Sequence, residues 1–270
     1  MAQRDPPDSY WTHLRPSRMQ VVPRRESTIL SSPVENYSTT DPELALRWSN
    51  EMRGEGNPAS FFLVPERFDS MVRTSDSCSL TLSGDGVFGM GFGPHPPLNP
   101  EWTRCIIDES TLGDRFGLLR ADDFWDFYSV NASLTQVDGD VETLEDEAEI
   151  TELLQIHASD SSVWPTNPEV VNWYGLRDED DRLVSLGALV RWESGLYVLA
   201  SITTVTELRG NGFAQELTQG IIARAREEGI DWLGLGVSHA NVAARRVYER
   251  AGFVARARFT TYARGDDQPD

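Results

Sequence analysis

Two segments in the C-terminal half carry residue types that could bind an anion and move a proton. In the first, Arg209-Gly210-Asn211-Gly212 separates an apolar strand-like run from an amphipathic helical pattern. Backbone N–H groups are unpaired at a helix N-terminus, and glycines let them approach an anion closely. Arg209 adds a planar cation. This combination suits a pyrophosphate, although a plain strand-to-helix turn has the same composition.

The second segment runs from Asn241 to Phe253. Asn241 and Tyr248 are seven residues apart, so on a helix they lie near one line about two turns apart. One interpretation is structural, with Asn241 as the N-cap and Tyr248 in the core. The other is chemical, because a tyrosine hydroxyl beside a leaving thiolate can protonate the sulfur. The reference pKa values, about 10 for tyrosine and about 8.5 for a thiol, make that transfer only mildly uphill.

Taken together, the two segments resemble the GNAT superfamily of acyl-CoA-dependent N-acyltransferases. The family's pyrophosphate motif, Gln/Arg-x-x-Gly-x-Gly/Ala, is matched by Arg209, Gly212 and Ala214. A later family helix, Asn-x-x-Ala-x-x-x-Tyr-x-x-x-Gly-Phe, is matched at every fixed position by Asn241, Ala244, Tyr248, Gly252 and Phe253. The second match alone would arise by chance in about one chain in ten thousand of this length.

The resemblance covers about Val137 to Tyr262 and implies which residues hold the coenzyme. It assigns the pantetheine amides to the backbone of Ile202, Thr203, Thr204 and Val205. It assigns the pyrophosphate to Arg209, Gly210, Asn211, Gly212, Phe213 and Ala214. It places Asn241 and Ala244 along the pantetheine arm and makes Tyr248 the general acid. Thr206 stands where many relatives have proline.

The attacking amine must lose a proton, and the sequence offers more than one candidate base. Glu207 precedes the glycine loop, and His239 ends a strand two residues before Asn241. A loop histidine without a catalytic role is the plainer interpretation of His239. A backbone N–H near Thr204 or Val205 could polarise the thioester carbonyl.

The elements that must position these residues follow from the apolar pattern. We expect helices over 145–158, 212–228 and 241–251, and strands over 171–177, 183–192, 196–205, 232–237 and 253–262. These elements indicate an α/β (α+β) fold. The resemblance implies a GNAT-like mixed sheet that is flanked by helices and splayed between the strands that end near Val205 and Val237.

The first half is harder to interpret. A helix should begin at Asp41-Pro42, and Phe61 to Val64 should form a short strand or buried turn. We divide the chain into a flexible extension (1–36), a smaller α/β domain (37–136), a catalytic domain (137–264) and an acidic tail (265–270). The smaller domain is either a degenerate copy of the same fold or a lid over the amine pocket, and we expect it to bind no second coenzyme.

Composition narrows the function classes. The net charge is −19, and this negative charge disfavours nucleic-acid partners, whose phosphates it would repel. All 24 basic residues are arginine. Two distant cysteines and four scattered histidines predict no disulfide framework and no metal. With no membrane-length apolar run and no apolar leader, we expect a cytoplasmic protein.

We therefore expect an N-acetyltransferase that moves an acetyl group from acetyl-CoA to a primary amine of a small molecule. The alternatives are a protein or peptide N-acetyltransferase and a non-catalytic acyl-CoA sensor. The oligomeric state is not readable from the sequence, a dimer being one option.

Overall fold

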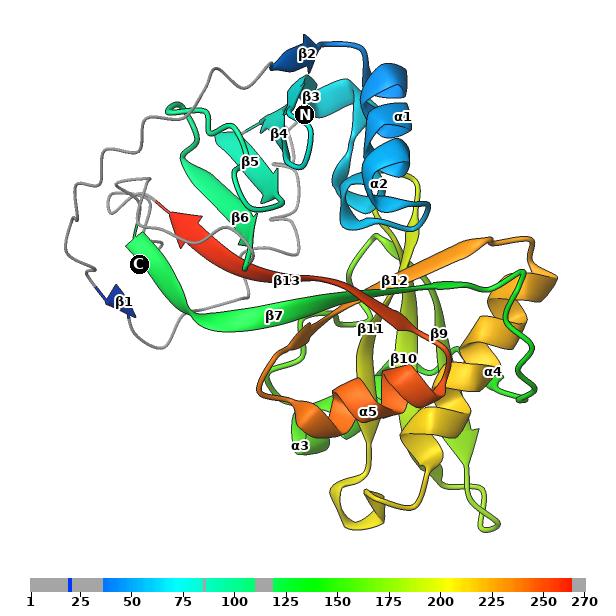
Figure 1. Cartoon of the computed structure of the whole chain (residues 1–270). Coiled ribbons are helices and arrows are strands. Elements are labelled where there is room, and N and C mark those ends of the chain that lie inside the picture. Colours follow the sequence, from blue (N-terminus) through cyan, green and yellow to red (C-terminus); the bar gives the residue numbers. More distant parts are fainter. Residues whose placement is uncertain (1–18, 21–35, 85, 110–118, 264–270) are drawn as a thin grey trace, which may run out of the picture.

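A computed structural model describes residues 19–20, 36–84, 86–109 and 119–263. Of the predicted N-terminal extension, only Met19, Gln20 and Asn36 are among them, and the acidic tail lies outside them. The described strands form one continuous curved sheet, which the long strands β7 and β13 carry from one half of the molecule to the other (Figure 1).

The N-terminal half contains two short helices and most of the shorter strands. Its helices are α1 (Pro42–Arg53), α2 (Pro58–Phe62) and the 3-10 turn η1 (Pro65–Arg67). Its strands are β1 (Met19–Gln20), β2 (Tyr37–Thr39), β3 (Phe68–Arg73), β4 (Cys78–Ser83), β5 (Val87–Phe92), β6 (Arg104–Asp108) and β7 (Leu119–Asn131).

The C-terminal half contains the remaining elements. Its helices are α3 (Glu147–His157), η2 (Thr206–Leu208), α4 (Phe213–Glu227) and α5 (Val242–Arg250). Its strands are β8 (Glu142–Leu144), β9 (Val170–Arg177), β10 (Leu183–Arg191), β11 (Tyr197–Thr204), β12 (Trp232–Ser238) and β13 (Val254–Ala263). All the helices and strands expected in this half are present, with ends shifted by a residue or two.

The helix expected at Asp41 is also confirmed. Asp41 accepts hydrogen bonds from the N–H groups of Glu43 and Leu44, and Pro42 occupies the first turn. Of the short strand or buried turn expected over Phe61 to Val64, the strand was wrong, because Pro58 to Phe62 form the short helix α2. The expected burial is confirmed for Phe61 to Leu63. Pro58 starts that helix, and the aromatic pair Phe61 and Phe62 is buried against β7 and, through Trp192, against the C-terminal half.

The strand order is the same in both halves when read from the two edges of the sheet. It runs β2-β3-β4-β5-β6-β13 from one edge and β8-β9-β10-β11-β12-β7 from the other. Among the described strands, the only parallel pairs are β5 with β6 and β11 with β12, which occupy matching places. Each half therefore contains five of its own strands in order, followed by the last strand of the other half.

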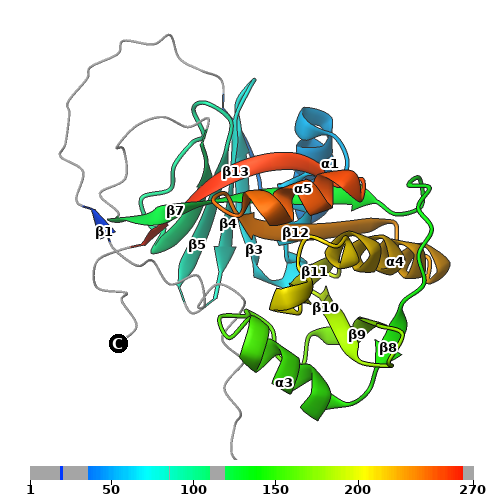
Figure 2. The same cartoon turned by 90° about the horizontal axis from the view of Figure 1, so that it is seen from below.

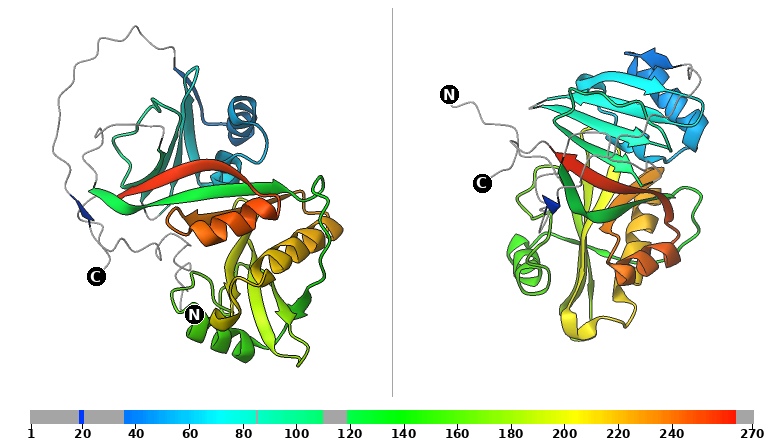
Figure 3. Two further views of the ribbon diagram at one scale, coloured as in Figure 1. Left: turned by 60° about the horizontal axis from the view of Figure 1, so that its bottom comes forward. Right: turned by 60° about the vertical axis from the view of Figure 1, so that its left-hand side comes forward.

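This exchange of strands makes the sheet continuous across the expected domain boundary at Val137. β7, which precedes that boundary, pairs with β12 from Trp232↔Asn131 to Ser238↔Trp125. β13 pairs with both β7 and β6. The two halves thus share backbone hydrogen bonds through two long strands that run side by side (Figures 1 and 3).

Helices cover both faces of the C-terminal sheet. α4 and α5 lie on one face, over a core that includes Leu217, Ile221 and Tyr128. α3 lies on the opposite face, where Leu153 and Leu154 join a second core (Figure 2). The same second core contains α2 of the N-terminal half, so α2 and α3 share a face.

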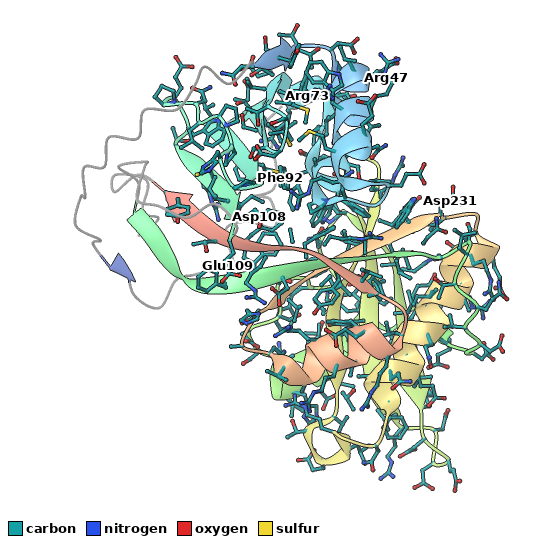
Figure 4. All side chains as sticks on the ribbon, in the orientation of Figure 1. Arg47, Arg73, Phe92, Asp108, Glu109 and Asp231 are labelled. Carbon is teal, nitrogen blue, oxygen red and sulfur yellow. The ribbon has the colours of Figure 1, made fainter. Side chains whose placement is uncertain are left out.

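The N-terminal half is held by polar as well as apolar contacts. Arg53 of α1 reaches Asp108 of β6 at 3.0 Å and lies over the ring of Phe92. Figure 4 labels Asp108 and Phe92. Arg67 of η1 pairs with Glu193, in the turn between β10 and β11, at 2.8 Å. The second pair is solvent-exposed, and we assign it little stability.

Docking of α2 is the contact that should matter most for stability. The ring of Phe61 is 1% exposed and lies 5.1 Å from that of Phe127, in an edge-on arrangement beside Gly234. Phe61→Ala should lower the free energy of unfolding by about 3–5 kcal/mol, the usual range for a buried phenylalanine. Urea denaturation measures this change, and Leu134→Ala, at a 78% exposed side chain, is the control. A loss of less than about 1 kcal/mol would contradict this packing.

Candidate functional site

The central strands β11 and β12 pair only near their N-terminal ends and then diverge. They run parallel and pair only at Tyr197↔Leu233 and Val198↔Gly234. Beyond these two pairs β11 stays with β10, and β12 stays with β7. The sheet therefore opens between the two strands toward their C-terminal ends, and each strand presents unpaired backbone groups to the opening.

A bulge in β11 marks this parting. Ser201 and Ile202 lie opposite the single residue Gly187 of β10, and Ser201 has φ +53. A non-glycine residue with positive φ is uncommon and costs free energy. The Ser201 hydroxyl donates to the carbonyl oxygen of Val163 at 3.0 Å, and Ser161 donates to the Ser201 hydroxyl at 2.6 Å. The segment after α3 thus stabilises the bulge.

The register of β10 and β11 decides which amides of β11 face the opening. The N–H of Val205 donates to the carbonyl oxygen of Val184, so Thr204 and Ser185 form a non-hydrogen-bonded pair. The backbone groups of Thr204 therefore point away from β10, toward the opening. Of the two candidate amides for polarising a thioester carbonyl, that of Thr204 points into the opening, whereas that of Val205 already donates to Val184.

The loop after β11 forms a nest of free amides. Gly210 has φ +86, and Gly212 has φ +95 at the N-cap of α4. Within the described residues the N–H groups of 210–214 make no hydrogen bond, and residues 210–212 are exposed. Successive free amides at the positive end of a helix form an anion site. The assignment of a pyrophosphate to this loop stays a prediction.

Arg209 is oriented by two carbonyl groups rather than left free. Its Nε donates to the carbonyl oxygen of Thr204 at 3.2 Å, and one terminal nitrogen donates to that of His157 at 2.8 Å. His157 is the last residue of α3, so Arg209 satisfies one of the carbonyls that end this helix. The guanidinium thus joins the end of α3 to the end of β11.

Across the opening, α5 begins at Asn241. The Asn241 side chain accepts the N–H of Ala244 at 3.1 Å, so it is an N-cap, and its carboxamide is exposed. This hydrogen bond supports the interpretation of Asn241 as an N-cap. Its exposed side chain is still accessible to a ligand. Ala244 is half-buried on the face that packs toward α4.

Tyr248 lies two turns further along α5 and is 8% exposed. Its ring contacts those of Tyr128 and Phe253, with centroids 6.5 Å and 6.1 Å away. Burial raises the pKa of Tyr248 to about 12, so the phenol keeps its proton at neutral pH. It can donate a hydrogen bond, but full transfer to a thiolate would cost about 5 kcal/mol, since the pKa values differ by about 3.5.

His239 follows β12 and belongs to a charged cluster that the sequence did not reveal. Its Nδ1 lies 2.8 Å from Oδ2 of Asp126, a side chain of β7 that is 3% exposed. Arg245 of α5 and Arg258 of β13 contact the same carboxylate at 2.9 and 2.8 Å. Burial works to raise the pKa of Asp126, but hydrogen bonds from His239 and Arg258 outweigh it and hold the pKa below its usual value.

The ionised Asp126 fixes the proton of the imidazole. A ring nitrogen that faces a carboxylate must donate, so Nδ1 carries a proton and Nε2 of the neutral ring is free to accept one. Glu207, the other candidate base, lies exposed in η2 on the β11 side of the opening. Of these two candidates, His239 is the one that a neighbouring carboxylate, Asp126, orients, as is common for proton-transfer residues.

Among the described residues no group of three or more His, Cys, Asp or Glu is placed to hold a metal ion. No helix in the described part of the chain is both long and apolar enough to cross a bilayer.

Comparison with known proteins identifies the frame around this opening. Residues 122–253 match the model of the acetyltransferase (GNAT) family. This region of the chain is a GNAT-family domain. The match begins inside β7, which agrees with the place of this strand beside β12. No curated protein matches the chain significantly.

Solved structures extend the likeness in fold. A GCN5-related N-acetyltransferase from Kribbella flavida is 15% identical, with 83% of this chain and 95% of that chain covered and a TM-score of 0.50. One from Sphaerobacter thermophilus is 15% identical, covering 82% and 84%, with a TM-score of 0.46. An acetyltransferase of the GNAT family from Colwellia psychrerythraea is 9% identical, covering 84% and 98%, with a TM-score of 0.46. The first of these supports the fold alone, and its coverage includes part of the N-terminal half.

The two ends of α4 provide a matched test of the nest. Gly212 at its start and Gly229 just after its end both have positive φ, and a Cβ atom would meet nothing within 4 Å at either position. Gly212→Ala and Gly229→Ala should each lower the free energy of unfolding by about 1–2 kcal/mol through backbone strain.

Only Gly212→Ala should also weaken the binding of coenzyme A, because its new methyl group stands beside the free amides. Calorimetric titration with coenzyme A measures the affinity of both variants. Equal affinity in the two variants would place the anion site elsewhere.

Proposed function

We propose that this protein transfers an acetyl group from acetyl-CoA to a primary amine of a small molecule, in a ternary complex of both substrates. The observation that carries the proposal is the opening between β11 and β12, with the free amides of 210–214 after β11 and the helix α5, which contains Tyr248, after β12. GNAT acetyltransferases use acetyl-CoA, and the match of residues 122–253 supports the same coenzyme here.

The chain offers groups suited to each part of such a coenzyme. The amides of 210–214 and the guanidinium of Arg209 would hold the diphosphate. The outward backbone of Thr204 and the neighbouring Ile202 would hold the pantetheine amides. The thioester supplies the acyl group, which the amine attacks directly, and holding both together does much of the catalytic work.

Two side chains would handle the protons. His239, oriented by Asp126, would take the ammonium proton at Nε2, directly or through water. Tyr248 would donate a hydrogen bond to the departing sulfur, since its raised pKa favours hydrogen bonding over complete proton transfer. The Thr204 N–H would stabilise charge on the carbonyl oxygen.

The net charge of −19 supports a cationic acceptor, because an acidic surface attracts amines in their ammonium form. A peptide acceptor and a non-catalytic sensor are the alternatives. An intact Tyr248 favours an enzyme over a sensor, since holding the coenzyme needs no group at its sulfur.

The direct test is release of the coenzyme thiol from acetyl-CoA across a panel of aminoglycosides, polyamines, amino acids and short peptides. Tyr248→Phe should lower kcat about a hundredfold while the affinity for acetyl-CoA stays within about twofold. Tyr197→Phe on β11, where the strands are still paired, is the control. Binding of acetyl-CoA without amine-dependent release would favour the sensor, and release with peptides alone would favour the peptide enzyme.

His239→Asn tests the base, because the asparagine amide can still donate to Asp126 but cannot accept a proton. The variant should lose about a hundredfold in kcat/KM at pH 7. The loss should shrink as the pH rises toward about 10, where most amines are already neutral. His95→Asn, at an exposed histidine of the other half, is the control. Wild-type rates at pH 7 would exclude His239 as the base.

A further inference from the structure

His157, which lies outside the family motifs, contacts the turn between β11 and the nest of amides with both its ring and its backbone. The N–H of Thr206 donates to Nδ1 of His157 at 3.2 Å, and the hydroxyl of Thr206 lies 3.0 Å from the same nitrogen. The carbonyl oxygen of His157 accepts the hydrogen bond from Arg209 at 2.8 Å. His157 thus contacts both ends of the turn that leads from β11 into the nest of amides.

These contacts fix the state of the imidazole. Because Nδ1 accepts a backbone N–H, it carries no proton, and the neutral ring carries its proton on Nε2. The residue standing at 206 is also informative. A threonine there supplies the N–H that the ring accepts, whereas a proline, common at this place in the family that the sequence resembles, has none.

The contacts of His157 are part of a larger clasp across β11, formed by residues 157–163. Further along the chain, Ser161 donates to Ser201 at the bulge, and Val163 accepts from the same hydroxyl. The clasp therefore holds β11 at the bulge where its pairing with β12 has ended, and again where the loop begins. These residues are the last residue of α3 and the segment after it, and α3 lies on the face of the sheet opposite α4 and α5.

We propose that His157 is a positioning residue for coenzyme binding, which holds Thr206 and Arg209 so that the free amides and the guanidinium converge on one anion. The inference rests on the proposed function, since it concerns the same coenzyme. It adds a residue that makes no contact with the reacting atoms and acts only through the turn. It also links the end of α3 to the affinity of the opening between β11 and β12 for the coenzyme.

The test compares wild type with His157→Ala, His157→Asn and the control Gln155→Ala, an exposed neighbour on α3. An asparagine Oδ1 can take the place of Nδ1 as acceptor, so it should rescue the contact with Thr206. Calorimetric titration with coenzyme A should show about fivefold weaker binding for His157→Ala, the effect of losing one or two hydrogen bonds. His157→Asn and Gln155→Ala should bind within about twofold of wild type, and kcat at saturating acetyl-CoA should be unchanged in all three.

A second readout needs no coenzyme. Amide hydrogen exchange of the unliganded protein should be faster at Thr206 and Arg209, whose N–H groups are bonded in this turn, in His157→Ala alone. If His157→Ala binds coenzyme A as wild type does, or if His157→Asn fails to rescue it, the positioning role is wrong. If wild type binds no coenzyme A, the proposed function fails, and unchanged exchange in His157→Ala would then overturn the clasp as well.

Discussion

The arrangement of this protein depends on how briefly β11 and β12 pair. Two residue pairs join them, after which β11 contains the bulge at Ser201 and pairs with β10 alone. A sheet that opens in its middle leaves backbone donors and acceptors without partners, which is costly unless water or a ligand satisfies them. The positive φ of Ser201 adds strain, and hydrogen bonds from residues 157–163 offset it. The chain maintains an unfavourable opening at the place where an extended, amide-containing ligand could restore the missing hydrogen bonds.

The N-terminal half shows the same topology without the opening. β5 and β6 are parallel, as β11 and β12 are, but they pair from Phe88↔Arg104 to Gly91↔Ile107 with no parting. Residues 93–103, which join them, form no helix, so no helix N-terminus faces this pair. The N-terminal half therefore lacks the two features, a parted parallel pair and a helix N-terminus beside it, to which we assign the coenzyme in the C-terminal half. Its α2 instead packs on the face of the C-terminal sheet that α3 also covers, with Phe62 5.1 Å from the ring of Trp192.

Sequence patterns predicted the C-terminal half closely because local signals agree there. Polar turns separate its strands, glycines stop its helices, and the motif at Asn241 fixes the register of α5. The same patterns could not reveal the exchange of β7 and β13, because pairing partners far apart in sequence leave no local trace. They did not predict α2 for a similar reason, since Phe61 is buried against β7 and β12, which lie far along the chain. Asp126 and His157 carried no motif, and their roles follow from contacts across 113 and 49 positions of the chain.

Hydrogen exchange with and without coenzyme A, resolved along the whole chain, tests the central claim most directly. We expect the coenzyme to slow exchange at Thr204 and at residues 210–214, whose amides have no partner in the described structure. We expect no change at residues 88–91 and 104–107, where the parallel strands of the N-terminal half are fully paired. Slowing in the N-terminal pair, or unchanged exchange at 210–214 with coenzyme bound, would contradict the placement of the site between β11 and β12.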